Sequence, residues 1–392
     1  MQPLDKYTNI ISKLIIFSIL AVLLLGLITT VFFSEDINAY ENRYAYKIAN
    51  LDFDSYLDKS FQDSFELALS DQIQLSNKAK RAYNLMETYI SRIALNPLRK
   101  AYDGYIYFKG NIIYKDMLLF AQYPYESTIY WLNFKIDSYN RLFEKHSDLD
   151  FYVYYIEKDT DIDFYKNEQA GFYEYIKSKL LLDENMMSGF EVNDFETFKK
   201  YFYATDHHWN NEGSYKGYLD VIKLLDPNIV PLKPLDTISF PKPFQGSKTS
   251  GFENILSDTM EIYLFEYPAM DIYVNGEIAR DYGNQQDFIQ NKIDSISYGT
   301  VFGNDEGEVI FDLDNDSSNL LIIGESYDNA IIKLIASHFD KTYCVDLRYY
   351  EHYMGKPFDF EKYIENNDID KVLLIGNIDF FSFKIFNIEG GE

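Results

Sequence analysis

Five consecutive residues in the middle of the chain, Asp206-His207-His208-Trp209-Asn210, carry the side-chain types needed for nucleophilic catalysis. The chain has only five histidines, and two of them stand side by side here. An acid two positions before a histidine can orient the imidazole and stabilise its cationic form, as in a nucleophile–base–acid triad. A serine activated by such a base would make this an acyl-transfer site.

Ser326 is the candidate nucleophile for such a site. It comes after the apolar run 320–323, which predicts a buried strand, and after Gly324 and Glu325. We expect a helix over 326–339, whose first N–H groups and partial positive charge would stabilise the oxyanion of a tetrahedral intermediate. The alternative is that Ser326 is an ordinary helix cap.

His208 is the candidate general base, with Asp206 holding its other ring nitrogen. His207 is the alternative base, although Asp206 adjoins it directly and its side chain would project in another direction. Two histidines and an acid could also bind zinc, but the sequence offers no third strong cluster of ligands. The remaining histidines stand apart from one another: His146, His338 and His352. We therefore expect a site without a metal, and we interpret Trp209 as a packing residue.

Three polar side chains are candidates for hydrogen bonds to the oxyanion. Asn304 and Asn377 each follow a glycine, and Arg348 follows a predicted strand. Each has an alternative role, because asparagines after glycines commonly make turns and Arg348 can pair with Asp346. The backbone N–H of Ser326 or of its neighbour is a further candidate donor.

The last third of the chain alternates predicted strands with predicted helices. Strands are expected over 320–323, 342–346 and 371–375, with helices over 326–339 and 360–365. This order is typical of a parallel sheet covered by helices. In such sheets a ligand binds at the carboxyl ends of the strands, and the candidate serine follows one of those ends.

The region before this alternating part is predicted to mix helices and strands. Apolar residues at helical spacing predict helices over 54–95, 126–146, 172–182 and 211–225. A hairpin is predicted over 103–117, and strands are predicted over 151–156, 261–274 and 299–302. The proline-bearing segment 227–243 is predicted to be a connector. Cys344, the only cysteine, lies in an apolar stretch, so no intramolecular disulfide is possible. We interpret it as a buried strand residue and not as a nucleophile.

The segment 14–33 is uncharged and mainly apolar, and as a helix it would span the roughly 30 Å hydrocarbon core of a membrane. Lys6 and Lys13 precede it and Glu35 and Asp36 follow it, which predicts a cytoplasmic amino terminus and a body outside. A cleaved signal peptide is the alternative, but its apolar core would be shorter and no cleavage site of small residues is found. The expected domains are a cytoplasmic end (1–13), a transmembrane anchor (14–33), a helical juxtamembrane region (34–100) and an α/β catalytic domain (101–392).

The charge balance limits the partners. The 392 residues carry a net charge of −26, with 62 acidic against 36 basic side chains. A protein that binds nucleic acid needs a basic surface for the phosphates, so the composition argues against that class of partner.

Three segments resemble the DHHW family of membrane-anchored bacterial proteins. They are Thr205–Ser214, which contains the Asp-His-His-Trp sequence, Leu321–Tyr327 and Tyr343–Tyr350. The resemblance runs from about the apolar segment to the carboxyl terminus and includes Tyr40–Arg43 and Asp71-Gln72. This family looks like a branch of the SGNH hydrolase superfamily, and it is similar to the proteins that O-acetylate alginate and related exopolysaccharides.

The resemblance implies a three-layer, SGNH-hydrolase-like parallel sheet flanked by helices. It assigns the triad to Asp206, His208 and Ser326. The acid and base precede the serine, which is the reverse of ordinary SGNH enzymes, and a permuted strand order would explain this. Glu325 stands where the family usually has aspartate, so the negative charge is kept.

The activity that the resemblance implies is transfer of an acyl group, specifically acetyl, to a cell-surface polysaccharide outside the cytoplasm. Ser326 would carry the acyl group, and no cofactor is needed. An esterase with the same triad and a non-catalytic envelope module that binds glycan or protein are the alternatives. A transferase of this kind would receive its acyl group from a membrane partner that exports it.

Overall fold

A computed structural model of the chain describes residues 2–32, 37–38, 43–44, 46–48, 53–57, 59–72, 76–249, 256–283, 285–292, 296–383 and 388. The chain divides into two compact units, Met1–Asn96 with Ser250–Ile255, and Pro97–Thr249 with Leu256–Glu392. All candidate site residues lie in the second unit. The boundaries expected for the anchor, the juxtamembrane region and the catalytic domain stay predictions.

The first unit is mainly helical, as expected for residues 54–95. Its elements are α1 (Gln2–Phe32), β1 (Ile37–Asn38), β2 (Arg43–Tyr44), α2 (Phe53–Leu57), α3 (Ser60–Gln72) and the first part of α4 (Ser76–Ala101). Among the described residues, no helix combines the length and the apolar character needed to cross a membrane. The anchor over 14–33 stays a prediction, and residues 40–42 of the family resemblance lie outside the described residues.

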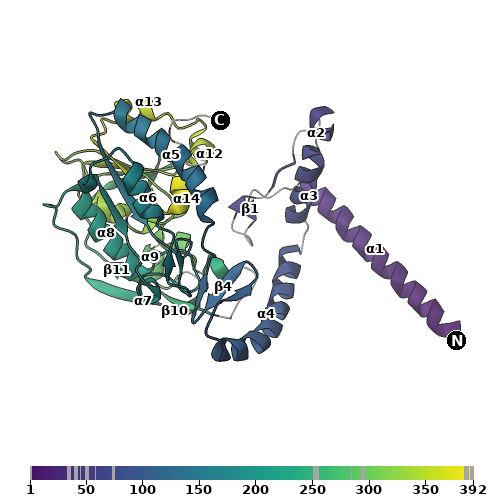
Figure 1. Cartoon of the computed structure of the whole chain (residues 1–392). Helices are drawn as coiled ribbons and strands as arrows, with labels where there is room; N and C mark the ends of the chain where they lie inside the picture. The colour runs from purple at the N-terminus through teal and green to yellow at the C-terminus, as the bar shows by residue number, and fades with distance from the viewer. Residues whose placement is uncertain are drawn as a thin grey trace. The chain divides into compact units, whose positions relative to one another are not determined.

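The second unit is built on one eight-stranded sheet (Figure 1). From edge to edge, its strands are β13 (Glu277–Ala279), β12 (Asp271–Val274), β14 (Glu308–Asp312), β16 (Lys341–Val345), β15 (Leu320–Ile323), β17 (Lys371–Gly376), β6 (Asp150–Ile156) and β9 (Met187–Phe190).

Ten α-helices after α4, three 3-10 turns and three smaller sheets complete this unit within the described residues. The helices are α5 (Tyr125–Lys145), α6 (Phe172–Lys179), α7 (Phe195–Tyr201), α8 (Asn211–Leu225), α9 (Gln285–Ile289), α10 (Tyr298–Phe302), α11 (Ile332–Ala336), α12 (Tyr350–Met354), α13 (Phe360–Asn366) and α14 (Ile378–Ser382), with the 3-10 turn η2 (Ser247–Thr249) near the site. The smaller sheets pair β3 (Ile106–Phe108), β4 (Asn111–Tyr114) and β5 (Met117–Leu119), β7 (Ile162–Asp163) with β8 (Glu168–Gln169), and β10 (Asp236–Phe244) with β11 (Asp258–Leu264).

The main sheet is mixed, whereas the sequence predicted a parallel one. β16, β15, β17, β6 and β9 are parallel, so that Ile323 pairs with both Val345 and Leu374. β14, β12 and β13 extend the β16 edge in antiparallel order. The prediction of parallel strands around the site is confirmed for β16, β15, β17 and β6, whereas β9 was not predicted. It is wrong for the far edge, where the polar and acidic residues around 305–308 gave no sign of the strand β14.

Side chains of the parallel strands alternate between two apolar cores, one on each face of the sheet. In β6, Tyr152 and Tyr154 pack into one core, and Val153 and Tyr155 pack into the other. The first core includes side chains from α7, α8 and α11, and the second includes side chains from α5, α6, α13 and α14. This burial on both faces gives the expected layers of helix, sheet and helix. Cys344 is buried in β16, as predicted.

Two short segments differ from their predicted structure. Residues 299–302, predicted as a strand, belong to the helix α10, whose cap Ser297 accepts a hydrogen bond from the Thr300 N–H at 3.1 Å. Burial of Tyr298 and Val301 overrides the weak strand preference of so short a run. The second half of the predicted connector 227–243 forms β10, a strand of a two-stranded sheet, where its prolines are tolerated.

The carboxyl ends of β15, β17 and β6 lie next to one another because these strands are neighbours in parallel register. Ser326 follows β15 and Asn377 follows β17. The polar segment 157–161 follows β6, and all five of its residues are buried. Chemically active side chains from three distant parts of the sequence therefore gather at one edge of the sheet.

Candidate active site

Ser326 lies on a turn that begins where β15 ends, and its side chain is partly exposed. Gly324 is required in this turn, since a Cβ there would lie 2.0 Å from the Asp328 Oδ2 atom. The helix predicted over 326–339 is wrong in its first part. Residues 326–327 form a turn, Asp328–Ala330 form a 3-10 turn, and only Ile332–Ala336 are α-helical. No α-helix therefore begins at the serine.

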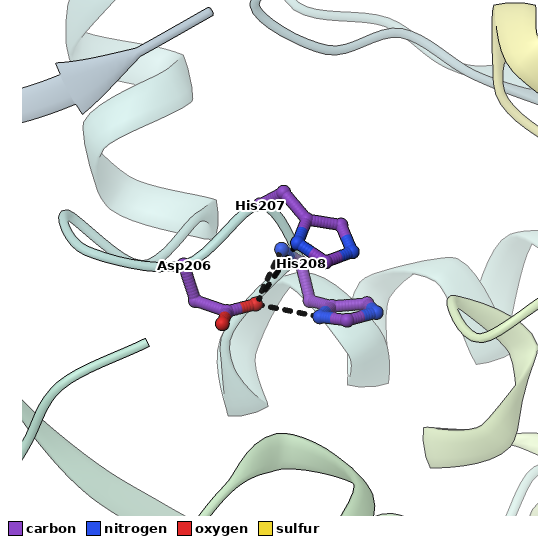
Figure 2. A group of neighbouring side chains, drawn as sticks. All are labelled: Asp206, His207 and His208. Carbon is purple, nitrogen blue, oxygen red and sulfur yellow. Dashed lines mark hydrogen bonds and ion pairs between the residues drawn. The ribbon is translucent and has the colours of Figure 1, made fainter. Parts of the chain in front are cut away.

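Asp206 and His208 lie on a loop between α7 and α8 that is closed at its base by a bridge between Phe202 and Trp209. The Asp206 Oδ1 atom accepts hydrogen bonds from the His208 backbone N–H at 3.0 Å and from the His208 Nδ1 atom at 2.6 Å (Figure 2). The Asp206 Oδ2 atom accepts the Ser247 N–H at 2.7 Å. Both oxygens of this buried carboxylate are thus used to hold the loop and the imidazole.

The other ring nitrogen of His208 meets the candidate nucleophile. The distance from His208 Nε2 to Ser326 Oγ is 2.8 Å, across 118 positions of sequence. The structure therefore brings all three predicted triad residues into one hydrogen-bonded line. In this arrangement the imidazole can take the hydroxyl proton while Asp206 stabilises the cation that forms.

The charge on Asp206 is maintained by its neighbours. Burial alone would raise the pKa of its carboxyl, but His208 and the Ser247 N–H hold that pKa well below its usual value. The carboxylate is therefore ionised at any pH where the protein would work, as an orienting acid must be.

A second, half-buried acid fixes the backbone of the triad loop. Asp258 accepts hydrogen bonds from the backbone N–H groups of Ala204 and Thr205, each at 2.8 Å. On the other side, a Cβ at Gly246 would lie 2.3 Å from the Asp206 Cβ atom, so the chain passes too close for any larger residue. These contacts set the position of Asp206 before any substrate binds.

The His208 ring is held between two other rings. Tyr298 stacks on one face, with ring centroids 3.8 Å apart and an interplanar angle of 1°. The His207 ring also lies 3.8 Å away, tilted by 36°. The Trp209 Nε1–H donates to the Tyr298 hydroxyl at 3.1 Å, so the tryptophan of the box supports the stacked tyrosine. Sequence reasoning missed Tyr298, because it lies just before a segment interpreted as a strand.

The three side chains proposed as oxyanion donors are not hydrogen-bonded to the candidate nucleophile within the described residues. The Arg348 guanidinium binds Asp346 through Nε and Nη2, with the Nε–Oδ1 distance 3.0 Å. The Asn377 amide donates to Glu325, and its carbonyl caps α14. Asn304 is exposed. Within the described residues, none of the three makes a hydrogen bond to Ser326, and the oxyanion role of each stays a prediction.

A buried charged network lies beside the serine. The Lys158 Nζ atom is 2.5 Å from Asp379 Oδ2, and Lys248 Nζ is 2.6 Å from Asp159 Oδ2. Burial raises the pKa of the Glu325 carboxyl to about 7, although the nearby positive charges of Lys158 and Arg348 oppose the shift. The residue before the nucleophile therefore exchanges a proton near neutral pH, a property that its sequence position did not reveal.

Asp206, His207 and His208 are also the one group of three possible metal ligands that the described part of the chain brings together, with ligand atoms within 4.8 Å of one another. Both ring nitrogens of His208 are already engaged, by Asp206 and by Ser326. A metal bound through His208 would have to break one of these two hydrogen bonds, so the geometry favours the triad over the zinc alternative.

Comparisons with known proteins show which solved structures have a similar fold. No protein-family model and no curated protein sequence matches the chain. The structure of Bacillus cereus PatB1 with a sulfonyl adduct matches 71% of this chain and 98% of its own, with 18% identity and a TM-score of 0.56. A DHHW family protein from Eubacterium siraeum matches 73% and 96%, with 17% identity and a TM-score of 0.55. This chain shares their fold.

The likeness to the DHHW family protein agrees with the resemblance drawn from the Asp-His-His-Trp sequence. The O-acetyltransferase domain of Pseudomonas putida AlgJ also aligns, over 72% of this chain and 93% of that one. Its identity of 10% and TM-score of 0.39 are too low to support a conclusion.

The raised pKa of Glu325 predicts a pH-dependent stability. In the unfolded chain this carboxyl loses its proton near its ordinary pKa of 4.5, whereas in the folded chain it keeps the proton up to about pH 7. The folded state therefore binds more protons in this window, and the free energy of unfolding falls as the pH rises from about 4.5 to about 7. A pKa difference of about 2.5, at about 1.4 kcal/mol for each unit, gives at most about 3 kcal/mol.

Glu325→Gln isolates this contribution, since glutamine can still accept the Asn377 hydrogen bonds. Asp161 and Glu157, whose pKa values burial raises to about 7 and about 8, add the same trend to both proteins. Urea unfolding at pH 5 and pH 8 should show the variant gaining stability relative to the native chain at the higher pH. Parallel pH profiles for the two proteins would contradict the raised pKa.

Proposed function

We propose that this protein is a serine-dependent acyltransferase that moves an acetyl group onto a hydroxyl of a cell-surface polysaccharide. The observation that carries the proposal is the hydrogen-bonded line from Asp206 through His208 to Ser326, with distances of 2.6 Å and 2.8 Å. A partly exposed serine hydroxyl at the carboxyl edge of a parallel sheet, in contact with an oriented imidazole, is arranged for nucleophilic attack.

The reaction has two halves that use the same residues. Ser326 Oγ attacks the donor carbonyl carbon and passes its proton to His208 Nε2, which then protonates the leaving group. In the second half, His208 removes a proton from the acceptor hydroxyl as that oxygen attacks the acyl carbon. The bond to Ser326 breaks, and Ser326 Oγ takes back the proton from His208. No step needs a cofactor.

The choice of acetyl group and of a polysaccharide is supported by the resemblance of the Asp-His-His-Trp segment to the DHHW family, and this chain shares the fold of the Eubacterium siraeum member. The same triad would make an esterase if water were the acceptor. The net charge of −26 is unfavourable for nucleic-acid partners.

The proposal includes the cellular location of the catalytic unit. We place the catalytic unit outside the cytoplasm, anchored by residues 14–33, where a membrane partner could supply the acyl group. This placement is supported by the uncharged run itself and by the exposed apolar side chains along α1, including Leu14, Phe17 and Leu24. The lysines before the run and the acids after it favour this orientation.

The triad predicts a reactive serine. PatB1 has been captured with a sulfonyl adduct, and an activated serine in this chain should likewise form a covalent sulfonyl ester with a sulfonyl fluoride. Ser326→Ala and His208→Ala should lower turnover of an aryl acetate by about a thousandfold or more. Ser178→Ala, which changes an exposed serine whose hydroxyl bonds only the Tyr175 carbonyl, is the control and should leave turnover unchanged.

Peptide mapping after the sulfonyl reaction should locate the added mass on Ser326. Equal background rates in the native chain and both triad variants would exclude the enzyme and favour a binding module. Turnover that releases acetate without ever forming a new ester with sugar alcohols would favour the esterase.

The anchor predicts firm membrane association. In cells that express the full chain, the protein should stay with the membrane fraction after an alkaline wash, and added protease should digest the body in intact spheroplasts. Leu20→Lys combined with Leu24→Lys should release it, because two charges within the apolar run oppose insertion. A native chain that is washed off, or is protected from added protease, would contradict the proposed location.

A further inference from the structure

A second serine–histidine pair adjoins the triad. The His207 Nδ1 atom lies 2.6 Å from Ser247 Oγ and 3.7 Å from Asp206 Oδ1. Its side chain is 30% exposed, compared with 7% for His208. Within the described residues, the His207 Nε2 atom has no hydrogen-bond partner. A partly exposed ring nitrogen without a partner, next to a nucleophile, is available to a substrate.

The two imidazoles face the same way. Figure 2 shows that each ring turns one nitrogen toward Asp206 and the other nitrogen away from it, to the same side. The nitrogens toward Asp206 are the Nδ1 atoms, so those turned away are the Nε2 atoms. Since His208 Nε2 meets Ser326 Oγ, and the ring centroids are 3.8 Å apart, His207 Nε2 lies beside the reacting atoms.

The ring form of His207 follows from its neighbours. The Asp206 carboxylate favours a proton on the nearby Nδ1 atom, which donates it to Ser247 Oγ, and this leaves Nε2 as an acceptor. Burial, together with the nearby His208, lowers the pKa of His207 well below its ordinary value, so the ring is neutral when the site works. Ser247 is held in turn, because its N–H donates to Asp206 at 2.7 Å.

We propose that His207 Nε2 accepts a hydrogen bond from the hydroxyl next to the one that receives the acyl group, so that the preferred acceptor is a vicinal diol. This inference rests on the proposed transferase function. The attacking hydroxyl has a single proton, which it donates to His208 Nε2. The same hydroxyl therefore cannot also donate a hydrogen bond to His207 Nε2. A hydroxyl on the adjacent carbon, as in a sugar ring, reaches the second imidazole, and water offers no such group.

The energetic effect is modest but measurable. A hydrogen bond that only the vicinal diol can make contributes about 1 kcal/mol. This energy corresponds to a preference of roughly five- to tenfold over an acceptor that cannot make the bond. His207 would thus help to select a sugar over water and over simple alcohols. Ser247 acts through His207, as a positioning residue.

The test compares propane-1,2-diol with propane-1,3-diol, which have the same atoms and differ only in hydroxyl spacing. An aryl acetate loads the full-length protein, and the burst of aryl alcohol measures acylation. The ester formed, relative to acetate released, then measures how the acyl-enzyme divides between alcohol and water. The native protein should prefer the 1,2-diol by roughly five- to tenfold.

Three substitutions test the hydrogen bond apart from the ring. His207→Phe keeps a ring against His208 but removes the nitrogens, so the preference between the two diols should fall to about one, measured as a ratio within the burst that the variant gives. His207→Gln keeps an acceptor and should retain part of the preference. Ser247→Ala should reduce the preference without abolishing the burst, because the Nδ1 proton loses its partner.

The outcomes distinguish the two proposals. A native burst with no diol preference, or an unchanged preference in His207→Phe, overturns the role of His207 and leaves the transferase intact. No burst in the native protein overturns the transferase and this inference with it. If His207→Phe does not fold, the native preference and His207→Gln still decide the question.

Discussion

The buried Asp206 carboxylate is the interaction on which the site depends. Its Oδ1 atom holds the His208 ring and backbone, and its Oδ2 atom holds the Ser247 N–H, 41 positions further along the chain. A buried carboxylate is costly unless hydrogen-bond donors surround it, so these contacts together offset the cost of burying Asp206. One anion thus fixes the loop, orients the imidazole and draws the Ser247 segment to the site.

The sheet supplies the other half of the geometry. Parallel register between β15, β17 and β6 places the turn of Ser326, the cap Asn377 and the polar segment 157–161 at one edge. The charges there are buried and paired, as with Lys158 and Asp379. Such pairs are rigid once formed, because breaking one leaves an uncompensated charge in a dry environment. The nucleophile therefore lies on a rigid base, whereas the acceptor side retains the partly exposed His207.

Much of this could be predicted from the sequence because the signals were local. The strands 320–323 and 371–375 are mainly apolar runs, and the triad histidine is one of only five in the chain and stands two positions after an acid. The failures fall in short segments, whose structure is decided by turn residues in one case and by tertiary packing in the other. The predicted helix at Ser326 gives way to tight turns, as Asp328 and Asn329 favour them. The predicted strand over 299–302 became a helix that presents Tyr298 to His208.

Other parts of the site had no sequence signal. Ser247 meets His207 only through the fold, and nothing near it in the sequence predicts that contact. The antiparallel edge of the sheet and the burial of the segment 157–161 are also consequences of assembly. A single sequence can therefore identify candidate chemistry, but the neighbours that orient and tune it depend on strands brought together from across the chain.

The central claim is that Ser326 carries the acyl group, and mass spectrometry during turnover tests it most directly. The full-length protein is mixed with an aryl acetate, quenched in acid within the first turnovers, and digested. We expect the mass of one acetyl group on the peptide that contains Ser326, and none in His208→Ala. An acetyl group found on another residue, or turnover without any acylated protein, would contradict it.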